Sequence, residues 1–401
     1  MILKVYFDAI ELHRQDKFVA LRFRSPHRLI SNSLDNGGIV DGLDLVYNHQ
    51  CCEPAGPLAR HPSRVVLDHP DLYAAALLER HGFGGLRAAQ LGTAANMSNL
   101  AVAFEEYRDI AVLAVATGGV EGNAARAGDP ASGYEFDGRY EPITREQPPA
   151  HGTINVMIAI NQPLLDGALV RAVMTATEAK SATLQELSVA SRYSPQLATG
   201  TGTDQVAVCA PRQGSSAPLR GAGHHTTAGE LIGKAVRRAL SETLLFQNGM
   251  HPAERGSCTR LMERFGLRGA ALIDAIVPLL PAEAGDSVRC APPMLDRDPM
   301  TVLAVAGYLH VDDQLTWGTA PPLCRREAAA MHGALIAAAA SGRRERWTAF
   351  HDELAGRCAA AGRDDPAFVV PLALGIGYAE KWQEQHAMLA SLDARITRDD
   401  G

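Results

Sequence analysis

The sequence lacks long apolar runs, a leader segment and any excess of basic residues, and each lack excludes a class of protein. No stretch of about 18 apolar residues is present, so no transmembrane helix is expected. The first residues, MILKVYFDAIELHRQDKF, carry charges throughout and have no apolar core, which argues against a signal peptide. The net charge of -7, with no long basic run, argues against nucleic acid as the main partner.

Cysteine is present but follows no recognisable pattern. The chain has seven cysteines in 401 residues, and only Cys51 and Cys52 are close in sequence. No CxxC spacing occurs, so we expect reduced thiols and a cytoplasmic location. The remaining composition, 46% hydrophobic and 21% charged, is typical of soluble globular proteins and provides enough apolar residues for a sizeable core.

The signatures of familiar hydrolases and nucleotide-binding proteins are also missing. There is no GxSxG, no HExxH and no cysteine in a catalytic motif. A glycine-rich segment, GGVEGNAARAGD, follows an apolar run at 112–117 that predicts a buried strand. This segment has neither the GxxxxGK[ST] nor the GxGxxG arrangement, so its residues do not favour a phosphate-binding loop.

A stretch from Gly152 to Glu230 contains the strongest structural patterns. An apolar run at 156–160 predicts a buried strand, and the periodicity at 167–187 predicts an amphipathic helix capped by Asp166.

Two polar segments end this stretch. The turn Thr199–Asp204 alternates glycine with threonine and leads into a β-like run at 205–209. His224 and His225 precede Thr227-Ala-Gly-Glu230, which is typical of a capping box that opens a second helix. Loops at the ends of elements usually carry function, so we expect the site here.

The flanking sequence predicts an α+β fold. Asp35-Asn36-Gly37-Gly38 lies between two β-like runs and predicts a hairpin, whereas Thr93 is expected to cap a helix that carries Met97, Leu100, Ala101 and Phe104. Helical patterns dominate after about 249, with a connector expected at 281–298. We therefore predict a mixed β-sheet core layered with helices over residues 1–248, followed by a helical C-terminal region over residues 249–401.

Several stretches taken together resemble a known family. In order along the chain they read PHRLISNSLDNGG, LGTAANMSNLAVAFEEY, VATGGVEGNAARAGDPA, HGTINVMIAINQPL, GALVRAVMTATEAKSATLQEL, ATGTGTDQVAV and AGHHTTAGELIGKAV. These stretches closely resemble the adenosylcobinamide amidohydrolase (CbiZ) family. The resemblance implies a corrinoid-salvage hydrolase that cleaves the amide between a corrin propionate side chain and the aminopropanol linker of adenosylcobinamide. It implies a corrinoid as the substrate, whereas no cofactor is firmly predicted.

Hydrolysis of an unstrained amide needs an activated nucleophile, a proton donor for the leaving amine and donors for the developing oxyanion. In one hypothesis, Asp204, Glu178 or a histidine activates water. His224 or His225 then acts as base or acid.

Two further routes stay open at the level of sequence. Thr153, which follows Gly152 directly before a buried strand, could become a nucleophile through self-cleavage of the chain. A metal site of histidine and carboxylate groups assembled across the fold is the third route, although no metal ligands are predicted.

Substrate contacts are expected near the glycine-containing turns, because a loop without side chains lets a bulky ligand approach the backbone. Asn155 or Thr201 could also donate to the oxyanion. The predicted substrate-binding residues are Asn36, Gly37, Gly38, Glu121, Asn123, Asn155, Thr201 and Thr203. The alternatives to this hydrolase are a corrinoid-binding protein without turnover and an amidase for a different large substrate. The sequence does not predict an oligomeric state.

Overall fold

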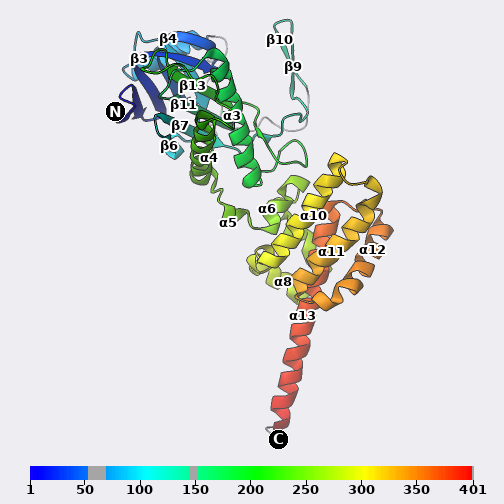
Figure 1. The fold of residues 1–401 in the computed structure, drawn as a ribbon. Coiled ribbons are helices and arrows are strands. Elements are labelled where there is room, and N and C mark those ends of the chain that lie inside the picture. Colours follow the sequence, from blue (N-terminus) through cyan, green and yellow to red (C-terminus); the bar gives the residue numbers. More distant parts are fainter. Residues whose placement is uncertain (53–68, 144–151, 400–401) are drawn as a thin grey trace. The chain divides into compact units, whose positions relative to one another are not determined.

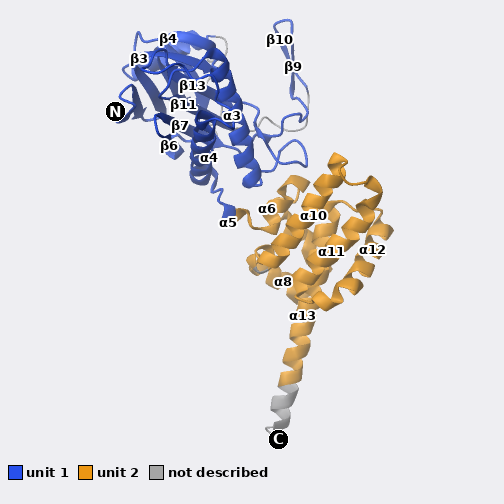
Figure 2. Ribbon diagram, viewed as in Figure 1, with its two compact units in different colours: residues 1–252 blue, residues 253–401 orange. Residues whose placement is uncertain are grey.

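The computed structural model describes residues 1–52, 69–143 and 152–399, and the chain forms two compact units, residues 1–252 and 253–401 (Figure 2). Unit 1 contains the strands β1 (Ile2–Tyr6), β2 (Ile10–Gln15), β3 (Phe18–Ser31), β4 (Gly38–Gln50), β5 (Ala88–Thr93), β6 (Ala101–Tyr107), β7 (Ile110–Gly119), β8 (Ala124–Ala125), β9 (Gly133–Phe136), β10 (Arg139–Pro142), β11 (Thr153–Ile160), β12 (Gly200–Thr201) and β13 (Gln205–Pro211). Its helices include α2 (Pro70–Arg80), α3 (Asp166–Glu186) and α4 (Thr227–Asn248). The predicted α+β fold, with a helical C-terminal region, is confirmed.

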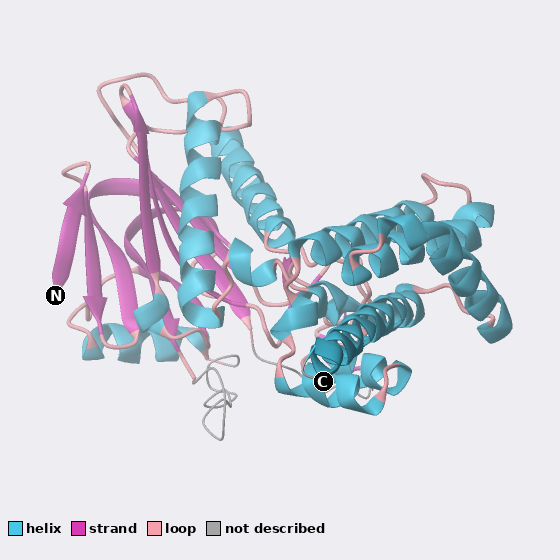
Figure 3. Cartoon of the chain, turned by 90° about the horizontal axis from the view of Figure 1, so that it is seen from below, coloured by secondary structure: helices cyan, strands magenta, loops and turns pink. Residues whose placement is uncertain are grey.

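Nine of the described strands form one mixed sheet in unit 1, seen with its helices in Figure 1 and Figure 3. Its main path runs β1-β2-β3-β13-β11-β7-β6, and β4 pairs with both β3 and β5. The pairs β11–β13 and β4–β5 are parallel, whereas the other pairs of this sheet are antiparallel. The sheet curls because its longest strand changes neighbour along its length.

Strand β3 makes this change of neighbour. Residues 18–23 pair with β2, whereas residues 27–31 pair with β13. The register with β4 shifts between Arg22 and His27, a segment that contains Pro26. Proline has no N–H to donate to a ladder, so it is suited to a strand irregularity of this kind. The bend brings β5 close to the strands β11 and β13 at the centre of the sheet.

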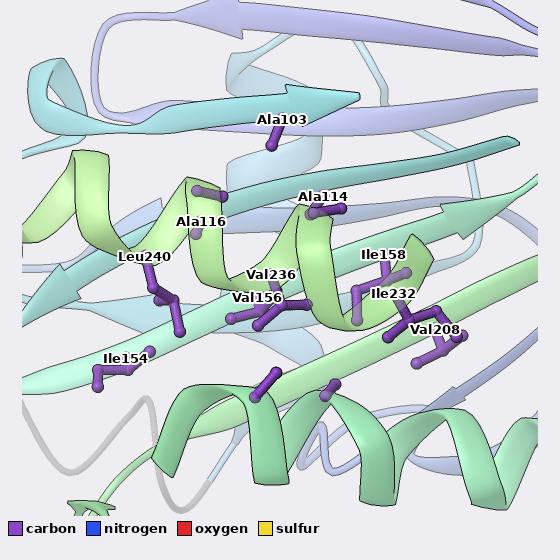
Figure 4. Close-up of a cluster of buried hydrophobic side chains, with 14 of the residues drawn as sticks. Ala103, Ala114, Ala116, Ile154, Val156, Ile158, Val208, Ile232, Val236 and Leu240 are labelled. Carbon is purple, nitrogen blue, oxygen red and sulfur yellow. The ribbon is translucent and has the colours of Figure 1, made fainter. Parts of the chain in front are cut away.

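Strand β11 separates two environments because its side chains alternate between the faces of the sheet. Ile154, Val156 and Ile158 face α3 and α4 and pack with Val208, Val236 and Leu240 (Figure 4). The intervening residues Met157 and Ala159 belong to a second cluster on the opposite face. All eight residues of β11 are buried, which agrees with the predicted buried strand.

The prediction of a helix after Thr93 is wrong. The chain there forms a short 3₁₀ turn, Met97–Asn99, followed by strand β6. Ala101 and Ala103 are buried in alternation and pair with β7, so the tertiary ladder overrides a spacing that also fits a helix.

Three other local predictions also need correction. The helix α4 is capped by Thr226, whose hydroxyl accepts from the backbone N–H of Gly229, and not by Thr227. Asp166 is the first residue of α3 rather than its cap. The connector expected at 281–298 contains two helices, α8 (Ala282–Cys290) and α9 (Pro293–Asp296).

Unit 2 is helical and has a separate apolar core. Its other helices are α5 (Pro252–Arg255, which begins at the last residue of unit 1), α6 (Cys258–Met262), α7 (Ala271–Ile276), α10 (Pro299–Trp317), α11 (Arg325–Ser341), α12 (Trp347–Ala361) and α13 (Pro366–Asp399). Val305, Ile336, Leu354 and Val369 are fully buried between these helices. Within the described residues, no helix combines the length and the apolar character needed to cross a membrane.

The packing of α4 on the sheet gives a test of the core of unit 1. Leu240 is fully buried, so Leu240→Ala is expected to lower the free energy of unfolding by about 2–5 kcal/mol. Leu245 lies on the same helix but is 38% exposed, so Leu245→Ala should cost less than about 1 kcal/mol. Urea unfolding followed by circular dichroism measures both values. Equal losses would contradict this arrangement of α4.

Candidate functional site

The candidate site lies where β11 begins. Thr153 is the first residue of this strand, pairs with Gly119 of β7 and is only 5% exposed. Its hydroxyl donates to the backbone carbonyl of Thr203, with 2.7 Å between the oxygens. The start of the central strand is thereby tied to the turn that precedes β13.

The carbonyl oxygen of Gly152 accepts two hydrogen bonds from side chains. Asn123 Nδ2 lies 3.1 Å from it, and Thr203 Oγ1 lies 3.0 Å from it. Gly152 can lie here because it has no side chain, since an added Cβ would be 2.8 Å from the carbonyl oxygen of Gly119 and 3.1 Å from Cβ of Asn123. Two donors that converge on one carbonyl oxygen form the geometry that stabilises a developing oxyanion.

The segments that supply these donors are held together by a short antiparallel pair. Strand β8, which follows Asn123, pairs with β12, which precedes Thr203. The backbone N–H of Ala127 also donates to Thr199 Oγ1 at 2.9 Å. The GGVEGNAARAGD segment and the Thr199–Asp204 turn, far apart in the sequence, therefore form one wall of the site.

The carboxylate of Asp204 is the most connected group in this region. It accepts from the backbone N–H of Ile154 at 2.9 Å, from the N–H of Thr201 at 3.0 Å and from the Thr201 hydroxyl at 2.5 Å. It also forms an ion pair with Lys180 of α3, and both of these side chains are only 15% exposed. Charge pairing and hydrogen bonds together offset the cost of burying the carboxylate.

Asn155 holds a buried amide network on the face of β11 opposite α3 and α4. It is fully buried, and its Nδ2 donates to Asn48 Oδ1 at 3.0 Å and to the carbonyl of Gly92 at 2.8 Å. Gln205 Oε1 in turn accepts from the Gly92 N–H at 2.7 Å. This network connects β4, β5, β11 and β13 where the sheet curls, and both N–H bonds of Asn155 are used within it.

A cavity of about 210 Å³ opens beside the Thr203 end of the site. Its lining includes Leu34, Tyr47, His49, Cys51, Tyr73, Gln90, Gly92, Thr203 and Gln205. Leu34 comes from the β3–β4 loop that holds the predicted Asn36, Gly37 and Gly38. In that loop Asn36 has a φ of +56° and donates to the carbonyl of Ala88 at 2.9 Å.

The cavity contains ionisable groups that the sequence did not indicate. Burial, together with the neighbouring His81 and Arg80, lowers the pKa of His49 to about 4. Its Nδ1 lies 3.1 Å from the hydroxyl of Tyr73. Burial also raises the pKa of the Cys51 thiol to about 12, so this thiol is not an activated nucleophile.

A second cavity, of about 430 Å³, lies beside Gly152. Its lining includes Ala95, Gly119, Glu121, Gly122, Gly152, Arg192, Gln247 and Asn248. Glu121 is exposed, which suits a substrate contact, and Arg192 adds a cation that the sequence did not single out. Gly152 lines this cavity and Thr203 lines the other, so their mutual hydrogen bond lies between the two spaces.

The structure places Glu178 and His224 together, but at the surface. His224 Nε2 lies 3.1 Å from Glu178 Oε2, and their side chains are 57% and 47% exposed. His225 is also exposed. In the part of the chain that the structure describes, no polar contact joins this pair to Asp204. The expected site residues therefore fall into two groups.

No group of three histidine, cysteine or carboxylate side chains is placed to hold a metal ion in residues 1–52, 69–143 and 152–399. The site is instead a polar cluster of amide, hydroxyl, lysine and carboxylate groups. Lys180 is the main member that the sequence did not predict.

The fold and the site define an α+β protein with a buried polar cluster at the start of its central strand. The chain belongs to the adenosylcobinamide amidohydrolase (CbiZ) family, whose model matches residues 3–252. The predicted family is therefore confirmed, and the match includes every residue of the candidate site. The family is named for an amidohydrolase.

Two individual proteins are similar to this chain. An uncharacterized protein of Methanocaldococcus jannaschii is 40% identical over 181 residues, which cover 44% of this chain and 70% of that protein. A crystal structure of a protein from Pyrococcus horikoshii OT3 matches 59% of this chain and 78% of its own, with 11% identity and a TM-score of 0.30.

A substitution at Gly200 tests the position of the Lys180–Asp204 ion pair. An added Cβ on Gly200 would lie 2.5 Å from Asp204 Oδ2 and 2.7 Å from Lys180 Nζ. Gly200→Ala should therefore separate the pair and lower the free energy of unfolding by about 1–3 kcal/mol. Gly233→Ala is the control, because a Cβ there meets nothing within 4 Å and alanine favours the helix. Urea unfolding distinguishes the two, and a neutral Gly200→Ala would contradict the site geometry.

The lowered pKa of His49 predicts that the stability of the chain depends on pH. Its folded pKa of about 4 lies below the ordinary histidine pKa of 6.5, so the unfolded chain binds the proton more readily. The stability from this group is present above pH 6.5 and is lost towards pH 4, at about 1.4 kcal/mol per pH unit. His49→Gln should flatten this part of the profile. Parallel profiles for wild type and His49→Gln in urea titrations would refute the assignment.

Proposed function

We propose that this chain hydrolyses the amide bond between the corrin side chain and the aminopropanol linker of adenosylcobinamide. The products are adenosylcobyric acid and 1-amino-2-propanol, and the corrinoid product can re-enter cobalamin synthesis. The observation that carries the proposal is the family match over residues 3–252, which includes all of the candidate site. The two cavities beside Gly152 and Thr203 support it, because they leave room on both sides of the polar cluster.

The chemistry of the reaction favours the cluster around Asp204 as the reaction centre. Amide hydrolysis needs oxyanion donors, and Asn123 and Thr203 are already directed at a carbonyl oxygen. It also needs a positioned proton acceptor and donor, and the Lys180–Asp204 pair is an ionisable group shielded from solvent.

We assign substrate contacts to the two cavities. The loop of Asn36, Gly37 and Gly38 borders the smaller cavity through Leu34, and Glu121 lies in the wall of the larger one. A corrin ring carries several amide side chains, which need hydrogen-bond donors and acceptors at the rim. The exposed His224–Glu178 pair is the competing candidate for acid–base chemistry.

Purified protein incubated with adenosylcobinamide tests the reaction, with release of aminopropanol followed by mass spectrometry. Asp204→Asn is expected to lower kcat by about 100-fold or more, because it breaks the ion pair of the cluster. Glu178→Gln and His224→Gln should stay within about threefold, as exposed groups outside the cluster. Glu186→Gln is the matched control, since Glu186 lies on the same helix and pairs with Arg237.

Each of the other outcomes would indicate a different reaction centre or a different function. Loss of turnover in Glu178→Gln or His224→Gln, with Asp204→Asn active, would move the reaction centre to the surface pair. A corrinoid absorbance change without product would indicate a binding protein without turnover. Absence of both would indicate a different amide substrate.

A further inference from the structure

We infer that this chain cleaves its own Gly152–Thr153 peptide bond and that the released Thr153 becomes the nucleophile of the site. The inference deepens the proposed function and rests on it for the identity of the final substrate. Three observations carry it: the two donors on the Gly152 carbonyl, the position of Thr153 and the hydrogen bonds that hold Thr153 and Ile154.

The Gly152 carbonyl is bound as an oxyanion would be bound. Its oxygen accepts from Asn123 Nδ2 at 3.1 Å and from Thr203 Oγ1 at 3.0 Å. Two side chains from separate segments therefore fill both acceptor positions of this carbonyl oxygen. Donors placed in this way lower the barrier to attack on the carbonyl carbon.

The attacking hydroxyl belongs to the next residue. Thr153 is 5% exposed, and its hydroxyl is held by the carbonyl of Thr203 at 2.7 Å. The backbone of the following residue is fixed as well, because the N–H of Ile154 donates to Asp204 at 2.9 Å. Thr153 pairs with Gly119 across the ladder to β7. Thr203 contacts both sides of the bond, since its hydroxyl donates to Gly152 and its carbonyl accepts from Thr153.

Other groups of the cluster are less directly placed to attack this bond. The Cys51 thiol in the neighbouring cavity has its pKa raised to about 12 by burial. The hydroxyl of Thr201 donates to the Asp204 carboxylate at 2.5 Å, a contact that can activate it, but Thr201 is not adjacent to Gly152 in the chain. Thr153 alone combines a hydroxyl with an adjacent polarised carbonyl.

Cleavage of the chain proceeds through an ester intermediate. The Thr153 hydroxyl oxygen attacks the Gly152 carbonyl carbon, the C–N bond breaks, and the hydroxyl proton is transferred to the nitrogen. The chain is then joined through an ester between Gly152 and the Thr153 oxygen. One water molecule hydrolyses this ester and leaves a Gly152 carboxylate and a free Thr153 hydroxyl. The new α-amine of Thr153 can serve as the base for its own hydroxyl.

Cleavage also frees the two oxyanion donors. Asn123 Nδ2 and Thr203 Oγ1 lose their bond to Gly152 once that residue moves away. They can then bind the carbonyl oxygen of the substrate amide, which Thr153 attacks in the same way. The peptide bond of the intact chain thus occupies the position of the amide that the mature site hydrolyses.

Intact-mass spectrometry of the purified full chain tests the inference. We expect two fragments, residues 1–152 and 153–401, that stay associated under native conditions. Periodate should convert the new N-terminal threonine to an aldehyde on the larger fragment, which an aminooxy probe detects. Thr153→Ala should give an uncut chain without turnover, and Thr153→Ser should restore cleavage. Thr177→Ala, an exposed threonine of α3, is the control and should be cut like wild type.

A second variant separates the oxyanion role from a folding defect. Asn123→Ala keeps Thr153 but removes one donor, so cleavage should slow by about 100-fold or more while the circular dichroism spectrum is unchanged. An uncut wild-type chain that releases aminopropanol would overturn the inference and leave the proposed function standing. A cut chain that releases none would keep the inference and overturn the substrate. An uncut chain without turnover would overturn both.

Discussion

The Asp204 carboxylate is the group on which the geometry of the site depends. It accepts a hydrogen bond from Ile154 at the start of β11 and pairs with Lys180 of α3. Within its own turn it accepts from the backbone N–H of Thr201. The backbone carbonyl of Asp204 also accepts a hydrogen bond from Asn32 Nδ2, just after β3, at 3.0 Å. A buried carboxylate without these partners would cost several kcal/mol, so the four segments are fixed relative to one another.

The side chains of strand β11 alternate between an apolar face and a polar face. One face gives Ile154, Val156 and Ile158 to the apolar core under α3 and α4. The other face gives Asn155 to the amide network with Asn48. A slip of one residue would place the amide in the apolar core and the isoleucines in the polar network, so the register is strongly specified. The position of Thr153 at the strand entry follows from the same register.

The sequence predicted the elements whose burial leaves a simple periodic pattern, such as β11 and α3. It failed at residues 97–104 because apolar residues there fit a helical spacing and a strand alternation equally, and pairing with β7 decided the outcome. The Thr199–Asp204 turn was found because glycine and threonine alternate within a few residues. Lys180 was missed because its partner lies 24 residues away, and the Asn48–Asn155 bond was missed because 107 residues separate the two amides. Such pairings are set by the tertiary fold, which local patterns do not encode.

The two hydrogen-bond donors on the Gly152 carbonyl are already occupied in the intact chain. Asn123 Nδ2 and Thr203 Oγ1 both point at the oxygen of Gly152, so in the intact chain they are not available to a substrate carbonyl. Any amide that is to be hydrolysed with their help must first displace this backbone carbonyl. Displacement without cleavage would take both donors away from the half-buried glycine carbonyl, and a carbonyl left fully buried without a partner costs about 1–3 kcal/mol. The self-cleavage that we propose would remove this cost, because Gly152 would become a chain end that can leave the site.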